Sequence, residues 1–367
     1  MQRCLKLAAK GQSRVSPNPR VGALLVGQDG DLLGEGFHVR FGGRHAESRA
    51  ISDVERRHGS DVLRTATLYV NLEPCNHVGK TPRCVDLILK KGISRVVFGM
   101  TDPNSMAAHG AARLRQQGVE VTGGVLESAC KRINEAFAHH VATGRPLVTL
   151  KIAQTLDGRI AGVSGRSRWI TGKKARTLVH KWRSENDGVL IGSGTALQDD
   201  PALTVRLTTG DQPHRYVLDR AGALPPGLQV FSDKHADHTT AIVGLTEPPY
   251  ARALAEAGGR ILMIPGEKDG HLDLHAILDS LGRDRGHHNL PLLSLLVEAG
   301  PQLATALLRE NLVDRLFVFV APRILGSGLP SFHGFGVTEL ADALTFAEHS
   351  WDRVGEDVLF RGYRHAC

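Results

Sequence analysis

The chain contains the stretch His45-Ala46-Glu47 and, further along, Glu73-Pro74-Cys75-Asn76-His77-Val78-Gly79-Lys80-Thr81-Pro82-Arg83-Cys84. The imidazole of His45 and the thiols of Cys75 and Cys84 are ligand types that zinc prefers. A catalytic zinc ion takes three protein ligands and keeps its fourth position for water, whose pKa it lowers toward neutrality. Glu47 lies two residues after His45, so it can transfer protons beside the metal without binding it. The stretch therefore predicts a catalytic zinc site with Glu47 as its proton-transfer group.

The same residues allow two other interpretations. His45, Cys75 and Cys84 could be buried without a metal, or they could form a structural zinc site with His77 as the fourth ligand. We favour the catalytic interpretation because Glu47 and the proline before Cys75 have no role in a purely structural site. A His-x-Glu motif followed by Pro-Cys is also the signature of zinc deaminases. That signature ends in P-C-x-x-C, however, whereas eight residues separate Cys75 from Cys84 here.

The segments around these motifs predict a layered α/β unit. One helix should begin at His45 and another at Cys84. His45 and Glu47 can face one metal only if the motif occupies the first turn of its helix, because the two positions are about 200° apart on a regular helix. An Asp29-Gly30 hairpin turn should follow the first strand. The expected strands are residues 21–27, 67–71 and 96–100.

A helix expected from residue 127 to about residue 141 completes the first unit. Thr143-Gly144-Arg145-Pro146 follows, and this cluster of breakers predicts a boundary between domains at residues 1–144 and 145–367. Beyond it, apolar strands alternate with helical segments, which predicts a mostly parallel sheet. Residues 192–206 are expected to form a long polar loop, and residues 282–288 a solvated loop.

Val297-Glu298-Ala299-Gly300-Pro301 has the form of a buried strand that leads into a helix. The free N–H groups at the start of such a helix can hold a phosphate group. From its spacing alone, however, the stretch could equally be an ordinary strand-to-helix turn. Gly192-Ser193-Gly194, which also follows a predicted strand, lacks the third glycine of a dinucleotide-binding fingerprint. The two motifs suggest a nucleotide site without establishing one.

Composition places the chain among globular proteins. Of its 367 residues, 41% are hydrophobic and 23% are charged, and no apolar run reaches the ~18–20 residues of a membrane helix. The N-terminus has no apolar signal core, so we expect a cytoplasmic protein without a membrane partner. The five cysteines do not suggest a disulfide framework. Cys4, Cys130 and Cys367 are expected to be free thiols.

The net charge of +7 favours anionic partners. Proteins that bind single-stranded nucleic acid usually combine a basic groove with stacking aromatic side chains. This chain has no long run of Lys and Arg, and only 5% of its residues are aromatic. The charge therefore predicts small phosphorylated ligands rather than nucleic acid.

Taken together, the motifs resemble the family of bifunctional riboflavin-biosynthesis deaminase/reductases. In the first half, the resemblance is carried by the two opening stretches and by Pro17-Asn18-Pro19-Arg20-Val21-Gly22, Gly36-Phe37-His38 and Asp102-Pro103-Asn104. In the second half, it is carried by Lys151, Asp157-Gly158-Arg159, Ser167-Arg168-Trp169-Ile170-Thr171, Asp199-Asp200-Pro201-Ala202-Leu203-Thr204-Val205-Arg206 and Val297-Glu298-Ala299-Gly300-Pro301. The resemblance covers nearly the whole chain and is weakest from residue 208 to residue 291.

The resemblance implies a cytidine-deaminase-like three-layer α/β/α domain followed by a dihydrofolate-reductase-like α/β domain. It implies that the first domain removes the 2-amino group of 2,5-diamino-6-ribosylamino-4(3H)-pyrimidinone 5′-phosphate by zinc-dependent hydrolysis. His45, Cys75 and Cys84 would hold Zn²⁺, and Glu47 would be catalytic. The residues implied to orient this substrate are Asn18, His38, His77, Lys80, Asp102 and Asn104.

The second domain is implied to use NADPH to reduce the ribosyl side chain to ribityl, giving 5-amino-6-ribitylamino-uracil 5′-phosphate. The positions implied to face the cofactor are Ala153, Trp169, Thr171, Thr195, Asp199 and Gly300. The positions implied to face the substrate are Lys151, Ser167, Arg183, Leu203, Arg206 and Glu298. Physical alternatives stay open, since Arg183 and Arg206 could form surface ion pairs instead of binding phosphate. Trp169 could equally pack in the core.

Two positions depart from the pattern of the family. Arg83 stands where a second proline is usual, and Ser105-Met106-Ala107-Ala108-His109-Gly110 replaces a more glycine-rich run. We expect both at the edge of the deaminase pocket. The main alternative function is a nucleic-acid or nucleobase zinc deaminase with an appended nucleotide-binding domain, and another is a zinc-stapled scaffold that binds a nucleotide. The family also suggests a homo-oligomer, either a dimer or a tetramer.

Overall fold

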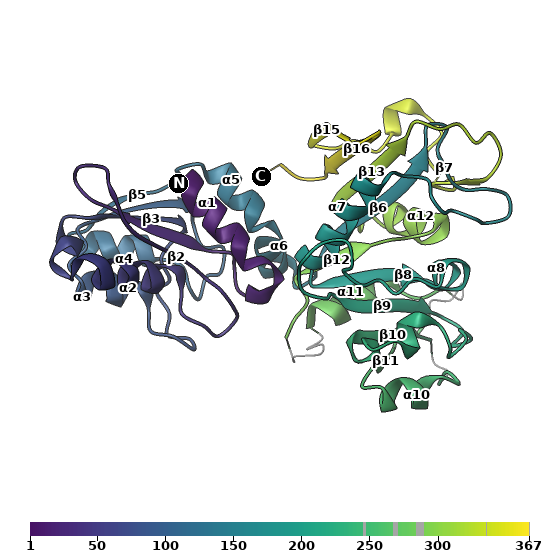
Figure 1. Cartoon of the computed structure of the whole chain (residues 1–367), viewed down its shortest axis with the longest axis horizontal. Coiled ribbons are helices and arrows are strands. Elements are labelled where there is room, and N and C mark those ends of the chain that lie inside the picture. Colours follow the sequence, from purple (N-terminus) through teal and green to yellow (C-terminus); the bar gives the residue numbers. More distant parts are fainter. Residues whose placement is uncertain (245–246, 267–270, 284–289, 335, 367) are drawn as a thin grey trace. The chain divides into compact units, whose positions relative to one another are not determined.

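The computed structural model describes residues 1–244, 247–266, 271–283, 290–334 and 336–366. Contacts within the chain divide it into two compact units, Met1–Gly144 and Arg145–Ala366 (Figure 1). Each unit has its own hydrophobic core. Among the described residues, no helix is both long enough and apolar enough to cross a lipid bilayer.

The first unit is built on a five-stranded sheet with the order β2-β1-β3-β4-β5. β1 runs antiparallel to both β2 and β3, while β3, β4 and β5 are parallel. The predicted Asp29-Gly30 turn joins β1 to β2, and Gly30 has a φ of +85°, which glycine adopts without steric cost. The strands are β1 (Gly22–Val26), β2 (Leu32–Phe37), β3 (Thr67–Leu72), β4 (Arg95–Met100) and β5 (Glu120–Thr122).

Helices cover both faces of this sheet (Figure 1). A β-carbon at Gly22 would lie 2.3 Å from the carbonyl oxygen of Cys4 in α1, and one at Gly36 would lie 2.6 Å from the amide nitrogen of Ala50 in α2. Gly36 pairs with Ala23, the neighbour of Gly22, so α1 and α2 pack on opposite faces and the predicted three layers are confirmed. The helices are α1 (Gln2–Ala8), α2 (Ala46–His58), α3 (Cys84–Lys90), α4 (Gly110–Gln116), α5 (Glu127–Ile133) and α6 (Glu135–Thr143), with 3-10 helices η1 (Ala9–Val15) and η2 (Asp61–Arg64).

The single helix predicted over residues 127–141 is wrong, because the chain breaks at Asn134 into α5 and α6. Asn134 is buried, with φ −108° and ψ 15°. Its side-chain oxygen accepts the amide N–H of Arg20 at 2.7 Å, and its side-chain nitrogen donates to the Arg20 carbonyl at 3.1 Å. This pair of hydrogen bonds fixes the segment before β1 and compensates for the interrupted helix.

The second unit is built on a nine-stranded sheet with the order β11-β10-β9-β8-β12-β6-β13-β16-β15. All neighbours from β11 to β13 are parallel, which confirms the predicted sheet, and the hairpin of β15 and β16 adds two antiparallel strands. The strands are β6 (Leu147–Thr155), β8 (Gly188–Gly192), β9 (His214–Asp219), β10 (Thr239–Val243), β11 (Arg260–Met263), β12 (Ser294–Val297), β13 (Arg315–Ala321), β15 (Glu348–Val354) and β16 (Asp357–Tyr363). A separate two-stranded ribbon pairs β7 (Arg159–Ala161) with β14 (Leu329–Pro330).

Two loop predictions in this unit need correction. Residues 193–199 form a helix, α8, although Gly194 and the polar residues beside it have low helix propensity. Gly282 and Arg283 are the last residues of α11, and residues 284–288 of the predicted solvated loop lie outside the described residues. The helices are α7 (Lys173–Glu185), α8 (Ser193–Asp199), α9 (Gln229–Ser232), α10 (Ala251–Glu256), α11 (Leu274–Arg283) and α12 (Pro301–Arg309), with 3-10 helices η3 (Ala236–His238) and η4 (Leu340–Asp342).

Candidate active sites

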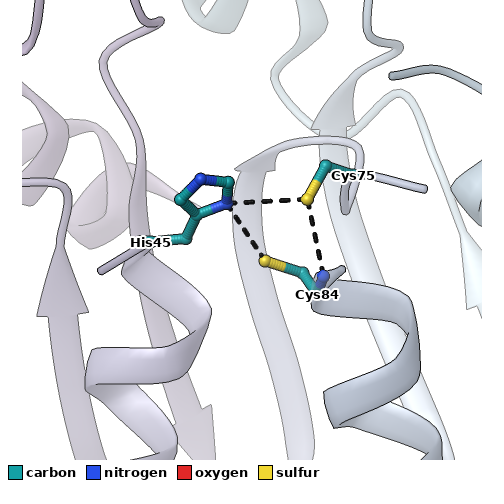
Figure 2. Close-up of side chains that lie close together, drawn as sticks. All are labelled: His45, Cys75 and Cys84. Atoms are coloured by element: carbon teal, nitrogen blue, oxygen red, sulfur yellow. Dashed lines mark hydrogen bonds between the residues drawn. The ribbon is translucent and has the colours of Figure 1, made fainter. Parts of the chain in front are cut away.

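The three predicted metal ligands converge at one edge of the first sheet. His45 is the N-cap of α2, Cys75 follows β3, and Cys84 is the first residue of α3. Nδ1 of His45 lies 3.5 Å from the Cys75 sulfur and 3.3 Å from the Cys84 sulfur (Figure 2). The backbone N–H of Cys84 donates to the Cys75 sulfur at 3.4 Å. The His-x-Glu motif therefore occupies a helix start, as its geometry requires.

This arrangement fits a zinc ion. Nitrogen and sulfur ligands about 2.0–2.3 Å from a tetrahedral centre are about 3.6 Å apart, close to the distances seen here. The three ligand atoms all lie within 4.8 Å of one another, and no other group of three or more His, Cys, Asp or Glu side chains in the described part of the chain meets this criterion. His77 does not belong to the group. The geometry thus provides three ligands, as in catalytic zinc sites.

The thiols form an electrostatically coupled pair. A hydrogen bond from Cys84 lowers the pKa of Cys75 to about 4 against the effect of burial, and His45 assists. The pKa of Cys84 is raised, first by its hydrogen bond to Cys75 and then by burial. The site therefore favours the thiolate form of Cys75, and binding of a dication would release the thiol proton of Cys84.

Glu47 lies in the first turn of α2, with only 3% of its surface exposed. Burial raises the pKa of its carboxyl group, and the charge of Cys75 adds to the effect. Its side chain contacts Cys84 through a hydrogen bond, but its oxygens are not part of the ligand group. A carboxyl group in this position can exchange protons with a molecule held at the metal.

A cavity of about 300 Å³ opens beside the triad. Asn18 and His38 meet in it, with the Asn18 amide nitrogen 3.0 Å from Nε2 of His38. On the other side of the His38 ring, Nδ1 lies 3.2 Å from the carbonyl oxygen of Arg44. All six residues predicted to orient the deaminase substrate line this cavity: Asn18, His38, His77, Lys80, Asp102 and Asn104.

Among the other residues that line the cavity, Glu73, Phe41 and Phe137 make contacts that were not predicted from the sequence. Glu73 accepts the backbone N–H groups of Asp102, at 3.2 Å, and Ala111, at 2.9 Å, and so ties two segments to β3. Phe41 lies under the Lys80 ammonium, 4.2 Å from its ring centroid. Phe137 reaches the cavity from α6. Glu73 could have been identified from its place in the Glu-Pro-Cys stretch, but no sequence signal marked the two aromatic residues.

The departures from the family pattern lie mostly outside the cavity lining. Arg83 is 3.7 Å from Asp86, whose other oxygen accepts a hydrogen bond from Arg113 at 2.6 Å. Arg83 and Ser105 are not among the lining residues, whereas Ala107 is. The Arg83 side chain joins an ion-pair network on α3 and α4.

In the second unit, Lys151, Arg183 and Glu298 form a charged cluster in which Arg183 is buried and the other two side chains are half-buried. The Glu298 carboxylate accepts hydrogen bonds from Nε of Arg183 at 2.6 Å and from Nη2 of Arg183 at 3.1 Å. Nζ of Lys151 lies 3.3 Å from the same carboxylate. Burial alone would raise the pKa of Glu298, but Arg183 and Lys151 together lower it to about 2. Arg183 is 9% exposed, so it is not a surface ion pair.

The loop after α8 is bound to this cluster. Nη1 of Arg183 donates to the carbonyl oxygen of Thr204 at 3.1 Å, and Nη1 of Arg206 donates to the Thr204 hydroxyl at 2.8 Å. The amide N–H of Arg206 donates to Nδ1 of His180 at 3.0 Å. Burial, followed by the charge of Arg183, lowers the pKa of His180 to about 4. His180 was missed from the sequence because no motif surrounds it on α7.

The residues predicted to face the cofactor lie on several segments. Gly192 and Gly300 cap the starts of α8 and α12, and a β-carbon at Gly300 would lie 3.5 Å from the Thr195 hydroxyl. The starts of the two helices therefore lie close together, an arrangement that can hold the phosphates of a dinucleotide.

The other predicted cofactor positions surround the segment from Ser167 to Thr171. Ser167 donates to Asp199 at 3.0 Å, and the Thr171 carbonyl accepts from Arg176 at 2.6 Å. The Arg176 guanidinium lies over the Trp169 ring, 4.4 Å from the ring centroid. Trp169 is 60% exposed, so the alternative that it packs in the core is wrong. Ala153 is part of β6.

Comparison with known proteins supports both halves. Residues 1–100 match the family model of the cytidine and deoxycytidylate deaminase zinc-binding region, and residues 146–360 match that of the RibD C-terminal domain. The riboflavin biosynthesis protein RibD of Aquifex aeolicus is 38% identical to this chain over 367 residues, which covers 99% of this chain and 98% of that protein.

Solved structures agree with this result. A diaminohydroxyphosphoribosylaminopyrimidine deaminase/5-amino-6-(5-phosphoribosylamino)uracil reductase from Thermotoga maritima matches with a TM-score of 0.84 and 37% identity, over 100% of this chain and 97% of that one. RibD from Acinetobacter baumannii (form 1) matches with a TM-score of 0.84 and 33% identity, over 99% of this chain and 97% of that one. Because the second half matches a reductase domain, an appended nucleotide-binding domain on a nucleic-acid deaminase is not favoured. The chain belongs to the family of bifunctional riboflavin-biosynthesis deaminase/reductases.

Proposed function

We propose that this chain deaminates 2,5-diamino-6-ribosylamino-4(3H)-pyrimidinone 5′-phosphate and then reduces its ribosyl side chain, giving 5-amino-6-ribitylamino-uracil 5′-phosphate. The observation that carries the proposal is the convergence of His45, Cys75 and Cys84 beside Glu47 in a cavity lined by polar groups. The name of the Thermotoga maritima relative, which states a pyrimidine deaminase and a uracil reductase, supports the choice of substrate.

In the deaminase reaction, His45, Cys75 and Cys84 would hold Zn²⁺, which makes a water molecule nucleophilic near neutral pH. Glu47 accepts a proton from that water and delivers protons to the ring and to the departing ammonia. Its burial beside the triad supports this role. Asn18, His38, His77 and Asp102, with Lys80 and Asn104, orient the pyrimidine and its phosphate.

When bound in the second unit, NADPH would be the source of the hydride that reduces C1′ of the ribose. We assign Lys151 and Glu298 to the reacting carbon, and their 3.3 Å contact supports this by pairing a cation with a carboxylate. The guanidinium of Arg183 already donates two hydrogen bonds to Glu298. We therefore assign Arg206 to the phosphate of the substrate and Arg183 to holding Glu298. Ser167 completes the substrate side, whereas Leu203, which is 1% exposed in a hydrophobic cluster, supports the loop from beneath instead of facing the substrate as predicted. The cofactor side is Ala153, Trp169, Thr171, Thr195, Asp199 and Gly300.

We assign the two activities to separate domains, residues 1–144 and residues 145–367. The lining of the deaminase cavity comes entirely from the first range, and the Lys151–Arg183–Glu298 cluster from the second. A coupled assay tests the function: zinc-loaded protein is mixed with the diaminopyrimidinone phosphate while ammonia and NADPH absorbance are followed together. Ammonia release followed by NADPH oxidation is expected. Ammonia without NADPH oxidation would refute the reductase assignment, and the absence of both would refute the substrate.

We also propose that the chain forms a dimer or a tetramer in the cytoplasm. Leu156, Ile324 and Leu325 support assembly, because they are 64%, 75% and 46% exposed on segments joined by a hydrogen bond from the Leu156 amide to Arg323. The free thiols of Cys4 and Cys130 support a reducing compartment. Light scattering after size exclusion tests the assembly, and a monomer would refute it.

A further inference from the structure

Leu203 has an unusual backbone conformation in the loop between α8 and β9. Its φ is 53°, in the left-handed region, and its side chain is 1% exposed in a hydrophobic cluster. A left-handed conformation is unfavourable for a residue other than glycine, because its β-carbon crowds the neighbouring carbonyl oxygen. Such residues persist only where surrounding contacts fix them, and they concentrate at functional sites. The contacts that fix Leu203 are therefore of interest.

Two buried arginines hold the carbonyl groups on either side of Leu203. Nη1 of Arg215 donates to the carbonyl oxygen of Ala202 at 2.9 Å, and Nη1 of Arg183 donates to that of Thr204 at 3.1 Å. Arg183 is itself held by Glu298. The conformation of Leu203 thus depends on one arginine that belongs to the reductase cluster and on a second, Arg215, that has no assigned role.

Arg215 is bound from every side. It lies on β9 with 1% of its surface exposed. The two terminal nitrogens of Arg215 donate hydrogen bonds to the two carboxylate oxygens of Asp233, at 2.8 and 2.9 Å. Its other bonds go to the Thr239 hydroxyl at 3.0 Å and to the carbonyl oxygens of Val230 at 3.0 Å and His235 at 2.6 Å. A lysine has three donors on a single nitrogen and cannot reproduce this planar fork.

We propose that Arg215 is a positioning residue of the reductase site. It holds Ala202 in place and so fixes the backbone turn at the buried Leu203, which sets the position from which Arg206 presents its guanidinium to the substrate. The inference rests on the proposed function of this loop. Arg215 itself contacts the loop backbone, so its effect reaches the pyrimidine substrate only through the loop.

A purely structural role for Arg215 would have a different kinetic signature. Loss of structure lowers the fraction of active enzyme, which reduces kcat and leaves KM unchanged. Loss of loop positioning weakens contact with the substrate, which raises its KM. The KM for NADPH reports on other segments and should stay constant. The deaminase activity of the same full-length chain provides an internal control.

The experiment compares Arg215→Lys, Asp233→Asn and the control Tyr250→Phe in the full-length protein. Tyr250→Phe removes a buried hydrogen bond of 2.8 Å to Asp219 in the same hydrophobic cluster without touching the loop. For Arg215→Lys we expect the KM for the deaminated pyrimidine to rise about tenfold, equivalent to about 1.4 kcal/mol. Asp233→Asn should give a smaller rise, and Tyr250→Phe none.

A lowered kcat with an unchanged KM in folded Arg215→Lys would overturn the proposal. Folding is checked by tryptophan fluorescence, because all three tryptophans lie in the second unit. If Arg215→Lys does not fold, Asp233→Asn decides by the same criterion. The reductase activity of the unsubstituted protein is measured first. If that activity is absent, the proposed function is refuted; if it is present, the variants test the role of Arg215.

Discussion

At the scale of single residues, the buried ionisable groups of the two units have different consequences. Glu47 is buried against a thiol pair, and its chemistry is tied to the metal site. His180 is buried among Arg183, Arg206 and Glu298, where burial and the two guanidinium charges disfavour a further positive charge. The first group should therefore affect the rate of one reaction, and the second should affect stability as a function of pH.

Glu47→Gln should abolish deamination without releasing zinc. Glutamine preserves the shape of the side chain but cannot accept and return a proton, so the deamination rate should fall by about 10²–10⁴-fold. Zinc content by metal analysis, ammonia release, and reduction of the deaminated substrate by the same sample are measured together. Cys84→Ser is the matched control and should lose zinc. If Glu47→Gln also lost zinc, Glu47 would be a ligand and its assigned role would be wrong.

The second unit should lose stability as the pH falls from about 6.5 to about 4. The unfolded chain binds a proton at His180 with a pKa near 6.5, whereas the folded protein does so only near pKa 4. Between these values the unfolded state holds the extra proton, so acidification favours unfolding. The midpoint of thermal unfolding, followed by tryptophan fluorescence, should therefore decrease between pH 6.5 and pH 4.5.

In His180→Asn the amide oxygen can still accept the Arg206 N–H, so this decrease should become shallower. Glu298, whose pKa is lowered from 4.5 to about 2, destabilises the fold only as the pH approaches 4.5, where the unfolded chain begins to bind its proton, so the two slopes are compared above about pH 5.5. An identical pH slope in the variant would contradict the assignment to His180.

At the scale of elements, the deaminase site depends on how closely α2 approaches the sheet. α2 carries His45 at its cap and Glu47 in its first turn, so any displacement of the helix moves both. The approach is possible because Gly36 has no side chain where β2 meets the helix backbone. Asn134 has a comparable role on the other side, since its bonds to Arg20 fix the segment that brings Asn18 to the cavity.

Gly36→Ala should destabilise the first unit by about 1–3 kcal/mol and weaken zinc binding. The new β-carbon would lie 2.6 Å from the backbone nitrogen of Ala50, so α2 must move. Thermal inactivation of deaminase activity and zinc retention during dialysis measure the effect. Gly27→Ala, in the same hairpin, is the control, because its β-carbon would meet only the Leu33 side chain at 3.6 Å. Equal behaviour of the two variants would show that the close approach is unimportant.

The elements also show what could be predicted from the sequence. The zinc triad was predictable because ligand chemistry and spacing identify it without any knowledge of the fold. The hairpin of β15 and β16 was not, because most β15 residues are exposed on both faces and no alternation of apolar residues marks the strand. α8 was missed because tertiary contacts outweigh the low propensity of its sequence. His180 and Phe137 occupy helix positions whose contacts arise only when distant segments fold together.

At the scale of the whole molecule, the proposed domains should be separable. Residues 145–367 contain a complete sheet and their own core, so this fragment should fold and bind NADPH by itself. Circular dichroism and NADPH fluorescence titration test this, with the full-length protein as the reference. An insoluble fragment, or one with NADPH affinity more than about tenfold weaker (about 1.4 kcal/mol), would contradict independent folding.

The presence of both sites in one polypeptide also constrains the pathway that the protein serves. Every translation event delivers one deaminase site and one reductase site, so the ratio of the two enzymes cannot be changed by gene regulation. A cell that makes more of this chain raises both capacities together. The size of the intermediate pool is then set by the kinetic constants of the two sites, and only amino-acid substitutions in one unit can alter the balance.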